Sequence, residues 1–281
     1  MEDKPVSPPG SPTSLGKMEH SLSNSSLLPV LGRATEFAWS ASIARSRGVY
    51  GFNSMDARSR SFNLIRAKLV ALQRERQWRM LGIVSATPGV GKSFVSASLA
   101  AAMSRDPRFL TTLVDLDLRR GTIGKIFGID LEVGLSDFFE SLDPETVVPA
   151  FRPQGEDLVI VPCVPANVHS AELLASGRAV QMLEAMRASD ARNFFFFDLP
   201  PVYANDDAAT TLDLLDGYVF IAEESRTTRQ EVQSAVEMLG RERLAGVVIN
   251  KYRGGLVSEG RGIEQRYASD YYAQETGEAI E

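Results

Sequence analysis

A glycine-containing loop between an apolar run and a helical pattern constrains this 281-residue chain more than any other feature. The loop reads SATPGVGKS over residues 85–93, after the apolar run MLGIV and before FVSASLAAAMS. Glycines let a backbone curl until successive N–H groups face one point, and the N-terminus of a following helix adds a partial positive charge there. This combination predicts a binding site for phosphate groups at the end of a buried strand.

The loop has the spacing of the Walker A motif, with Ala86 at the position where the first glycine usually stands. We expect Lys92 to reach the β- and γ-phosphate oxygens and Ser93 to offer its hydroxyl to a magnesium ion. The sequence therefore predicts ATP and Mg²⁺ as cofactors. The residues expected to contact the nucleotide in this loop are Thr87, Pro88, Gly89, Val90, Gly91, Lys92, Ser93 and Phe94.

Acidic residues follow two later apolar runs, where a phosphate-binding loop needs them. In LVDLDLRR, Asp115 and Asp117 occupy alternate positions, which point the same way on a strand. In FFFFDLPP, Asp198 stands at the carboxyl end of an apolar strand, where open parallel sheets bind their ligands. We therefore expect Ser93, Asp117 and Asp198 to hold the metal. The candidate catalytic residues are Lys92, Asp115, Asp117, Arg119 and Asp198.

Short apolar runs alternate with longer helical patterns from about residue 56 to residue 250. Runs of strand length that lack polar alternation indicate strands buried on both faces, which is typical of a parallel sheet covered by helices. We predict an α/β fold that is doubly wound, with a mostly parallel sheet flanked by helices, of the P-loop NTPase type.

Composition divides the chain into three parts. Residues 1–30 contain five prolines and seven serines, which favours disorder, and we expect a disordered or extended leader over residues 1–50. The nucleotide-binding domain is expected over residues 51–255 and a flexible tail over 256–281.

Charge, cysteine content and hydropathy indicate where the chain works. A net charge of -6 argues against bulk binding of nucleic acid. The single cysteine cannot form an internal disulfide, which fits a reducing cytoplasm. The apolar runs fall short of the roughly 20 residues that cross a bilayer. We expect a cytoplasmic chain that a partner recruits to the inner face of the plasma membrane.

Six segments, in their order along the chain, carry a resemblance to a known family. They resemble the bacterial tyrosine kinases of capsule and exopolysaccharide synthesis. The resemblance implies an ATP-dependent kinase that phosphorylates tyrosines in its own tail and regulates polysaccharide polymerisation and export. It also implies a homo-oligomer, a membrane polysaccharide co-polymerase whose cytoplasmic segment is the partner, and a cognate tyrosine phosphatase. The segments are SATPGVGKS, LVDLDLRR, GLSDFFE, NVHSAELLAS, FFFFDLPPV and GVVIN.

The resemblance also implies roles for particular residues. A phenol of pKa about 10 is ionised to about one part in a thousand at pH 7, so transfer to tyrosine needs a base. That base would be Asp115 or Asp117, while Lys92, Arg119 and magnesium neutralise the γ-phosphoryl charge. Asn250 would meet the adenine base. The implied phosphoacceptors are Tyr267, Tyr271 and Tyr272.

A departure from the family pattern leaves alternatives open. Arg60, Asn63 and Arg66 stand where the family usually carries a Glu-x-x-Arg-x-x-Arg motif for packing subunits into a ring. A module that binds ATP and changes shape without phosphorylating anything is therefore a rival interpretation. A partition or division-site ATPase is a second rival, although Thr87 stands where those proteins carry a second lysine.

Overall fold

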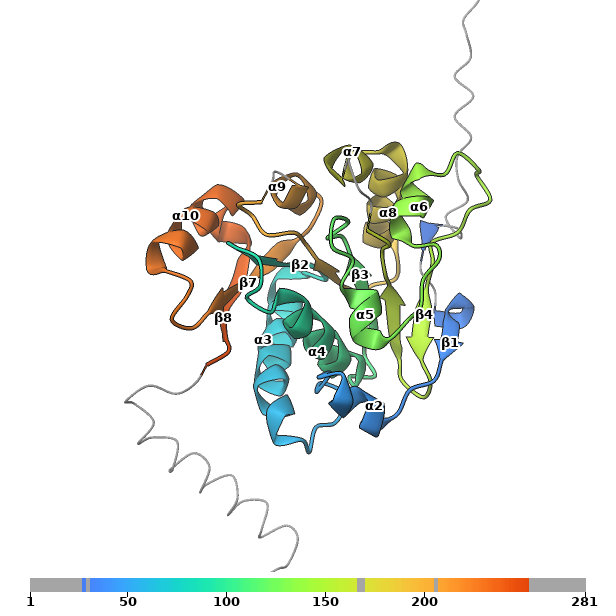
Figure 1. The fold of residues 1–281 in the computed structure, drawn as a ribbon. Helices are drawn as coiled ribbons and strands as arrows, with labels where there is room; N and C mark the ends of the chain where they lie inside the picture. Colours follow the sequence, from blue (N-terminus) through green and yellow to red (C-terminus); the bar gives the residue numbers. More distant parts are fainter. Residues whose placement is uncertain (1–26, 29–30, 166–169, 205–206, 253–281) are drawn as a thin grey trace, which may run out of the picture.

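The computed structural model describes residues 27–28, 31–165, 170–204 and 207–252 (Figure 1). These residues form one eight-stranded sheet in the order β1-β4-β5-β3-β6-β2-β7-β8. Neighbouring strands run parallel, except that β4 and β5 pair antiparallel. The strands are β1 Thr35–Phe37, β2 Met80–Ser85, β3 Leu110–Asp115, β4 Phe151–Pro153, β5 Leu158–Val161, β6 Asn193–Asp198, β7 Gly217–Glu223 and β8 Leu244–Asn250.

Helices cover both faces of the sheet, as Figure 1 shows. Phe194 and Phe196 of β6 point into a core cluster with α3, α4 and α5, while Phe195 and Phe197 point into a second cluster with α8, α9 and α10. The predicted doubly wound α/β fold is therefore confirmed. The helices are α2 Ala41–Ser46, α3 Arg60–Arg76, α4 Lys92–Ser104, α5 Ile123–Phe127, α6 Leu135–Glu140, α7 Ser170–Leu174, α8 Gly177–Ala188, α9 Asp207–Leu212 and α10 Arg229–Leu239.

The prediction of a disordered or extended leader was wrong for residues 31–50. This segment forms β1, which pairs with β4, and helix α2. Its apolar side chains explain why: Trp39 is 8% exposed and Val49 is 1% exposed, and the Trp39 ring packs against Phe52 and Phe127. Residues 1–26 of the predicted leader, and the whole predicted tail 256–281, lie outside the described residues.

Strand β8 differs from the expectation of strands buried on both faces. Val247 is 45% exposed and Ile249 is 61% exposed, although both belong to an unbroken apolar run. The reason is position, because β8 ends the strand order and pairs with β7 alone among the described strands. The apolar run therefore predicted the strand correctly, but it did not predict how far the strand is buried.

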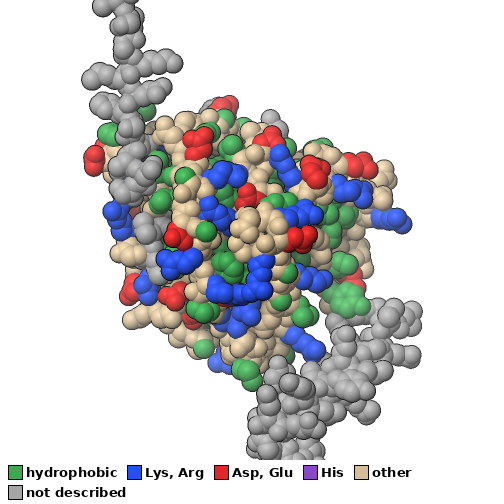
Figure 2. All heavy atoms as spheres, turned by 180° about the vertical axis from the view of Figure 1, so that it is seen from behind, with side chains coloured by type: hydrophobic (Ala, Val, Ile, Leu, Met, Phe, Trp, Pro, Cys, Tyr) green, Lys and Arg blue, Asp and Glu red, His purple; other side chains and the backbone are tan. Residues whose placement is uncertain are grey.

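The surface seen from behind carries charges of both signs. Figure 2 shows Lys and Arg side chains lying among Asp and Glu side chains and apolar groups on that face. In the part of the chain that the structure describes, no helix is both long enough and apolar enough to cross a membrane.

Replacement of Trp39 tests whether residues 31–50 belong to the folded domain. Removing a buried Trp side chain typically costs about 3–5 kcal/mol, so Trp39→Ala should lower the free energy of unfolding by about that amount. Urea unfolding followed by circular dichroism measures it. Leu142→Ala is the control, because Leu142 is 99% exposed and its loss should change stability by less than about 0.5 kcal/mol. An unchanged stability of Trp39→Ala would show that the segment is not part of the core.

Candidate active site

The predicted phosphate-binding loop joins strand β2 to helix α4. Strand β2 ends at Ser85 and α4 begins at Lys92. Gly89 and Gly91 take positive φ angles of 84° and 86°, which side-chain-bearing residues rarely adopt. A Cβ atom on Gly91 would also lie 2.3 Å from the side-chain amide nitrogen of Asn250. Backbone conformation therefore favours glycine at both positions, and the close approach of Asn250 is a second reason for glycine at position 91.

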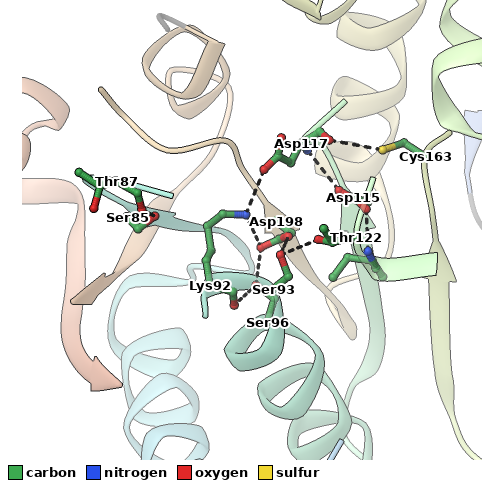
Figure 3. Close-up of polar contacts among 11 residues, drawn as sticks. Ser85, Thr87, Lys92, Ser93, Ser96, Asp115, Asp117, Thr122, Cys163 and Asp198 are labelled. Atoms are coloured by element: carbon green, nitrogen blue, oxygen red, sulfur yellow. Dashed lines mark hydrogen bonds and ion pairs between the residues drawn. The ribbon is translucent and has the colours of Figure 1, made fainter. Parts of the chain in front are cut away.

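A buried carboxylate, Asp198 at the end of β6, binds side chains from the first two turns of α4 (Figure 3). Lys92 Nζ lies 2.8 Å from Asp198 Oδ1. Ser93 Oγ donates to Asp198 Oδ2 at 2.6 Å, and Ser96 Oγ donates to Asp198 Oδ1 at 2.7 Å. The structure thus brings together the lysine, the serine and one aspartate that sequence reasoning assigned to a single site.

The two aspartates of LVDLDLRR have different surroundings. Asp115 is fully buried, and its oxygens accept hydrogen bonds from the backbone N–H groups of Ile123 at 2.9 Å and Asp117 at 3.2 Å. Asp117 is 4% exposed, lines the cavity described below, and places Oδ2 3.8 Å from Lys92 Nζ. Asp117 therefore borders the phosphate-binding loop, whereas Asp115 lies behind it.

Burial governs protonation in this cluster. Removal from water, together with the nearby Asp198 carboxylate, raises the pKa of Asp115 to about 8. Burial also raises the pKa of Asp117, although Lys92 opposes the shift. The thiol of Cys163, which lies 3.6 Å from the Asp117 carbonyl oxygen, has a pKa raised by burial as well. A thiol that stays protonated packs as a small apolar group, and Cys163 is buried in the core.

A cavity of about 390 Å³ opens in front of the loop. Of the predicted contact residues of the loop, Thr87 and Val90 do not line it, and the side chain of Val90 packs in the core beneath. Cationic side chains from outside the loop, Arg120 and Lys125, do line it. The lining residues are Ser85, Pro88, Gly89, Gly91, Lys92, Ser93, Phe94, Asp117, Arg120, Thr122, Lys125, Ile126 and Pro201.

Several predicted residues lie elsewhere. The Arg119 side chain donates from Nε to Ser170 Oγ at 2.8 Å and does not line the cavity. Asn250 donates its side-chain amide to the Val90 carbonyl oxygen at 2.8 Å. The predicted phosphoacceptors Tyr267, Tyr271 and Tyr272 lie outside the described residues.

Sequence reasoning missed Ser96, Thr122, Arg120 and Lys125. Thr122 Oγ1 donates to Ser93 Oγ at 2.7 Å, so it touches the hydroxyl expected to face magnesium. Ser96 follows Ser93 by one helical turn, a spacing that would have placed both hydroxyls on one face of α4. Thr122 had no comparable signal in the sequence.

The residues present fit a magnesium ion that is shared with phosphate groups. Across the described residues, no group of three or more His, Cys, Asp or Glu side chains is placed to hold a metal by itself. Magnesium is usually held by one or two carboxylates together with waters and substrate phosphates. Ser93, Asp117 and Asp198 would be its protein neighbours here.

P-loop nucleotide-binding proteins are defined by a phosphate-binding loop between a parallel strand and a helix. Acidic side chains stand at the ends of the neighbouring strands, as they do here. The chain belongs to the CobQ/CobB/MinD/ParA nucleotide binding domain family, whose model matches residues 81–273.

Its relatives are bacterial tyrosine kinases, which confirms the resemblance read from the motifs. The tyrosine-protein kinase YwqD of Bacillus subtilis (strain 168) is 29% identical over 195 residues, covering 68% of this chain and 80% of YwqD. The tyrosine-protein kinase etk of Escherichia coli (strain K12) is 31% identical over 188 residues, covering 66% of this chain. The match spans 25% of the length of etk, so this chain corresponds to one part of that protein.

Solved structures agree on the fold. The kinase domain of Escherichia coli tyrosine kinase ETK superposes with a TM-score of 0.57 at 28% identity, covering 69% of this chain and 78% of that domain. The chimerical protein CapA2B2 superposes with a TM-score of 0.64 at 23% identity, covering 82% of this chain and 97% of that protein. Both matches support the P-loop architecture.

Replacement of Asp115 tests the raised pKa. Between its ordinary value of 3.8 and about 8, the folded chain holds a proton on Asp115 that the unfolded chain has lost. The free energy of unfolding should therefore fall as the pH rises through this window, by up to about 1.4 kcal/mol per pH unit. Asp115→Asn removes this group, so the variant should depend less on pH.

Urea unfolding of the protein free of nucleotide and magnesium, from about pH 5 to about pH 8, measures this slope. Asp130→Asn, the same change at an exposed carboxylate, is the control and should keep the wild-type slope. Equal slopes for wild type and Asp115→Asn would contradict the assignment.

Proposed function

We propose that this chain is an ATP-dependent protein-tyrosine kinase that phosphorylates its own tail and thereby regulates the polymerisation and export of a capsular or exopolysaccharide. The observation that carries the proposal is the contact of Lys92 and Ser93 with Asp198, beside Asp117, at the mouth of the P-loop. The names of the relatives, which are tyrosine-protein kinases, support the same reaction.

The cavity suits a polyanion such as a triphosphate. Lys92 is 6% exposed in the loop itself, and Arg120 and Lys125 add two cationic side chains to the cavity wall. Together with the N-terminus of α4, these groups would bind and orient the phosphates. Magnesium, when bound, would neutralise part of the charge that develops on the transferred phosphoryl group.

Asp117 is the better placed of the two candidate bases. The phenol must lose its proton as its oxygen bonds to the γ-phosphorus and the bond to the leaving ADP breaks. Asp117 borders the cavity, so it can receive that proton directly. Asp115 is fully buried and bound to backbone N–H groups, and we assign it to positioning the turn that carries Asp117.

The proposal includes assembly and location. We propose a cytoplasmic homo-oligomer that the cytoplasmic segment of a membrane polysaccharide co-polymerase recruits to the membrane, and whose phosphotyrosines a cognate phosphatase removes. These partners rest on the family resemblance.

A second candidate function is an ATP-binding module that regulates assembly without transferring phosphate. The direction of Arg119 favours it, because this side chain binds Ser170 instead of lining the cavity. The subunit-packing motif also differs, since Asn63 accepts a hydrogen bond from Arg105 and Arg66 donates to the Ala102 carbonyl oxygen at 3.1 Å, both within the same chain.

A phosphotransfer assay separates the two functions. The purified full chain is incubated with radiolabelled ATP and magnesium, and mass spectrometry then locates phosphotyrosine. Lys92→Met should lower phosphotyrosine formation by about 10²-fold or more, because it removes a cation from the phosphoryl group. Lys68→Met, the same change at an exposed lysine of α3, is the matched control and should transfer as wild type does.

The site of modification is tested in the same assay. Replacing Tyr267, Tyr271 and Tyr272 together by Phe should abolish the label. An absence of phosphotyrosine in wild type, both alone and with a co-polymerase cytoplasmic segment, would leave the binding module as the function.

A further inference from the structure

Two consecutive residues, Asn250 at the end of β8 and Lys251 directly after it, donate hydrogen bonds to the phosphate-binding loop. Asn250 donates its side-chain amide to the Val90 carbonyl oxygen at 2.8 Å. Lys251 Nζ donates to the Gly89 carbonyl oxygen, also at 2.8 Å. These contacts join segments that lie about 160 residues apart in the sequence.

The Lys251 side chain is held in place from β7. Its ammonium group lies 3.1 Å from Glu223 Oε1 at the end of that strand. The hydrogen bond with Lys251 is the main reason that the pKa of Glu223 is lowered. Arg226 pairs with the other oxygen of the same carboxylate at 3.2 Å. A fixed carboxylate thus sets the position of the ammonium group that reaches the loop.

The backbone at Lys251 has an unfavourable conformation for a residue with a side chain. Its φ angle is +56°, in the left-handed region that residues other than glycine seldom adopt. Such a conformation persists only where surrounding contacts maintain it, and it is common at functional sites. The side chain of Lys251 makes two such contacts, to Glu223 and to the Gly89 carbonyl oxygen.

Peptide geometry connects these bonds to phosphate binding. In a trans peptide unit the C=O group and the N–H group of the next residue point in opposite directions. The hydrogen bond that points the Gly89 C=O group towards Lys251 therefore points the Val90 N–H group in the opposite direction. The hydrogen bond from Asn250 to the Val90 C=O group does the same for the Gly91 N–H group. Gly89 and Gly91 line the cavity, whereas Asn250 and Lys251 do not.

We propose that Lys251 and Asn250 are positioning residues that hold the Gly89 and Val90 carbonyl groups outward, and so keep the N–H groups of Val90 and Gly91 directed at the phosphates. The loop is then preorganised before nucleotide arrives, which lowers the cost of ordering it on binding. The proposal rests on nucleotide binding at this loop and does not depend on transfer to tyrosine.

Two variants and a control test the role of Lys251. Lys251→Met keeps the length of the side chain but removes the donor, and Lys251→Arg restores a donor. Arg226→Met is the matched control: it removes a cation from the same Glu223, but in the described residues Arg226 donates to no carbonyl of the loop. All are compared as the full chain by equilibrium binding of a fluorescent ATP analogue with magnesium.

We expect Lys251→Met to weaken ATP binding about tenfold, Lys251→Arg to recover most of the loss, and Arg226→Met to stay within about twofold of wild type. Wild-type affinity in Lys251→Met would overturn the proposal. An equal loss in Arg226→Met would also overturn it, because attraction between charges would then explain the effect without the hydrogen bond.

Hydrogen exchange without nucleotide provides a readout that does not depend on binding. Lys251→Met should speed exchange at the amides of Val90 and Gly91 in the loop and leave exchange in helix α4 unchanged. Faster exchange throughout the domain would contradict a local role and indicate a general loss of stability. If the wild-type chain bound no ATP, the proposed function would fail, yet the exchange at these two amides would still decide whether Lys251 positions the loop.

Discussion

The buried carboxylate of Asp198 is the contact on which the rest of the site depends. It is 0% exposed and binds Lys92, Ser93 and Ser96 in the first turns of α4. A buried charge is tolerated only when it is paired and hydrogen-bonded, and removing one partner typically costs about 3–5 kcal/mol. Asp198 therefore ties the N-terminus of α4 to the end of β6 and fixes the loop over the edge of the sheet.

Sheet topology explains why the acidic residues converge. Strand β6 lies between β3 and β2, so that Asp198 pairs in register with Asp115 on one side and with Ile83 on the other. Parallel strands present their carboxyl ends at the same edge, and the loop that follows β2 opens at that edge. Three adjacent strands thus supply the phosphate-binding loop and its carboxylates from segments distant in sequence.

The same packing gives different roles to two aspartates, Asp115 at the end of β3 and Asp117 in the turn after it. Asp115 is held by backbone N–H groups, and burial beside Asp198 favours its protonated form in the chain free of ligand. Asp117, two residues later, reaches the cavity and Lys92. A single motif therefore supplies one carboxyl group that supports the turn and another that lines the cavity.

The sequence predicted the parts of the structure that have a local pattern. Long apolar runs identified the central strands, and the loop and its acidic partners followed from spacing. Strands β1 and β4 have three residues each, too few for any periodicity to show. The burial of Trp39, the turning of Arg119 towards Ser170 and the contact of Lys251 with Gly89 depend on packing between distant segments, which no local pattern reports.

A crystal structure of the full chain with magnesium and a non-hydrolysable ATP analogue tests the central claim most directly. We expect the β- and γ-phosphates to bind the backbone N–H groups of residues 89–93 and Lys92 Nζ, with the metal beside Ser93 Oγ and facing Asp117 and Asp198. An analogue bound elsewhere, or phosphates that leave Lys92 and the loop untouched, would contradict it.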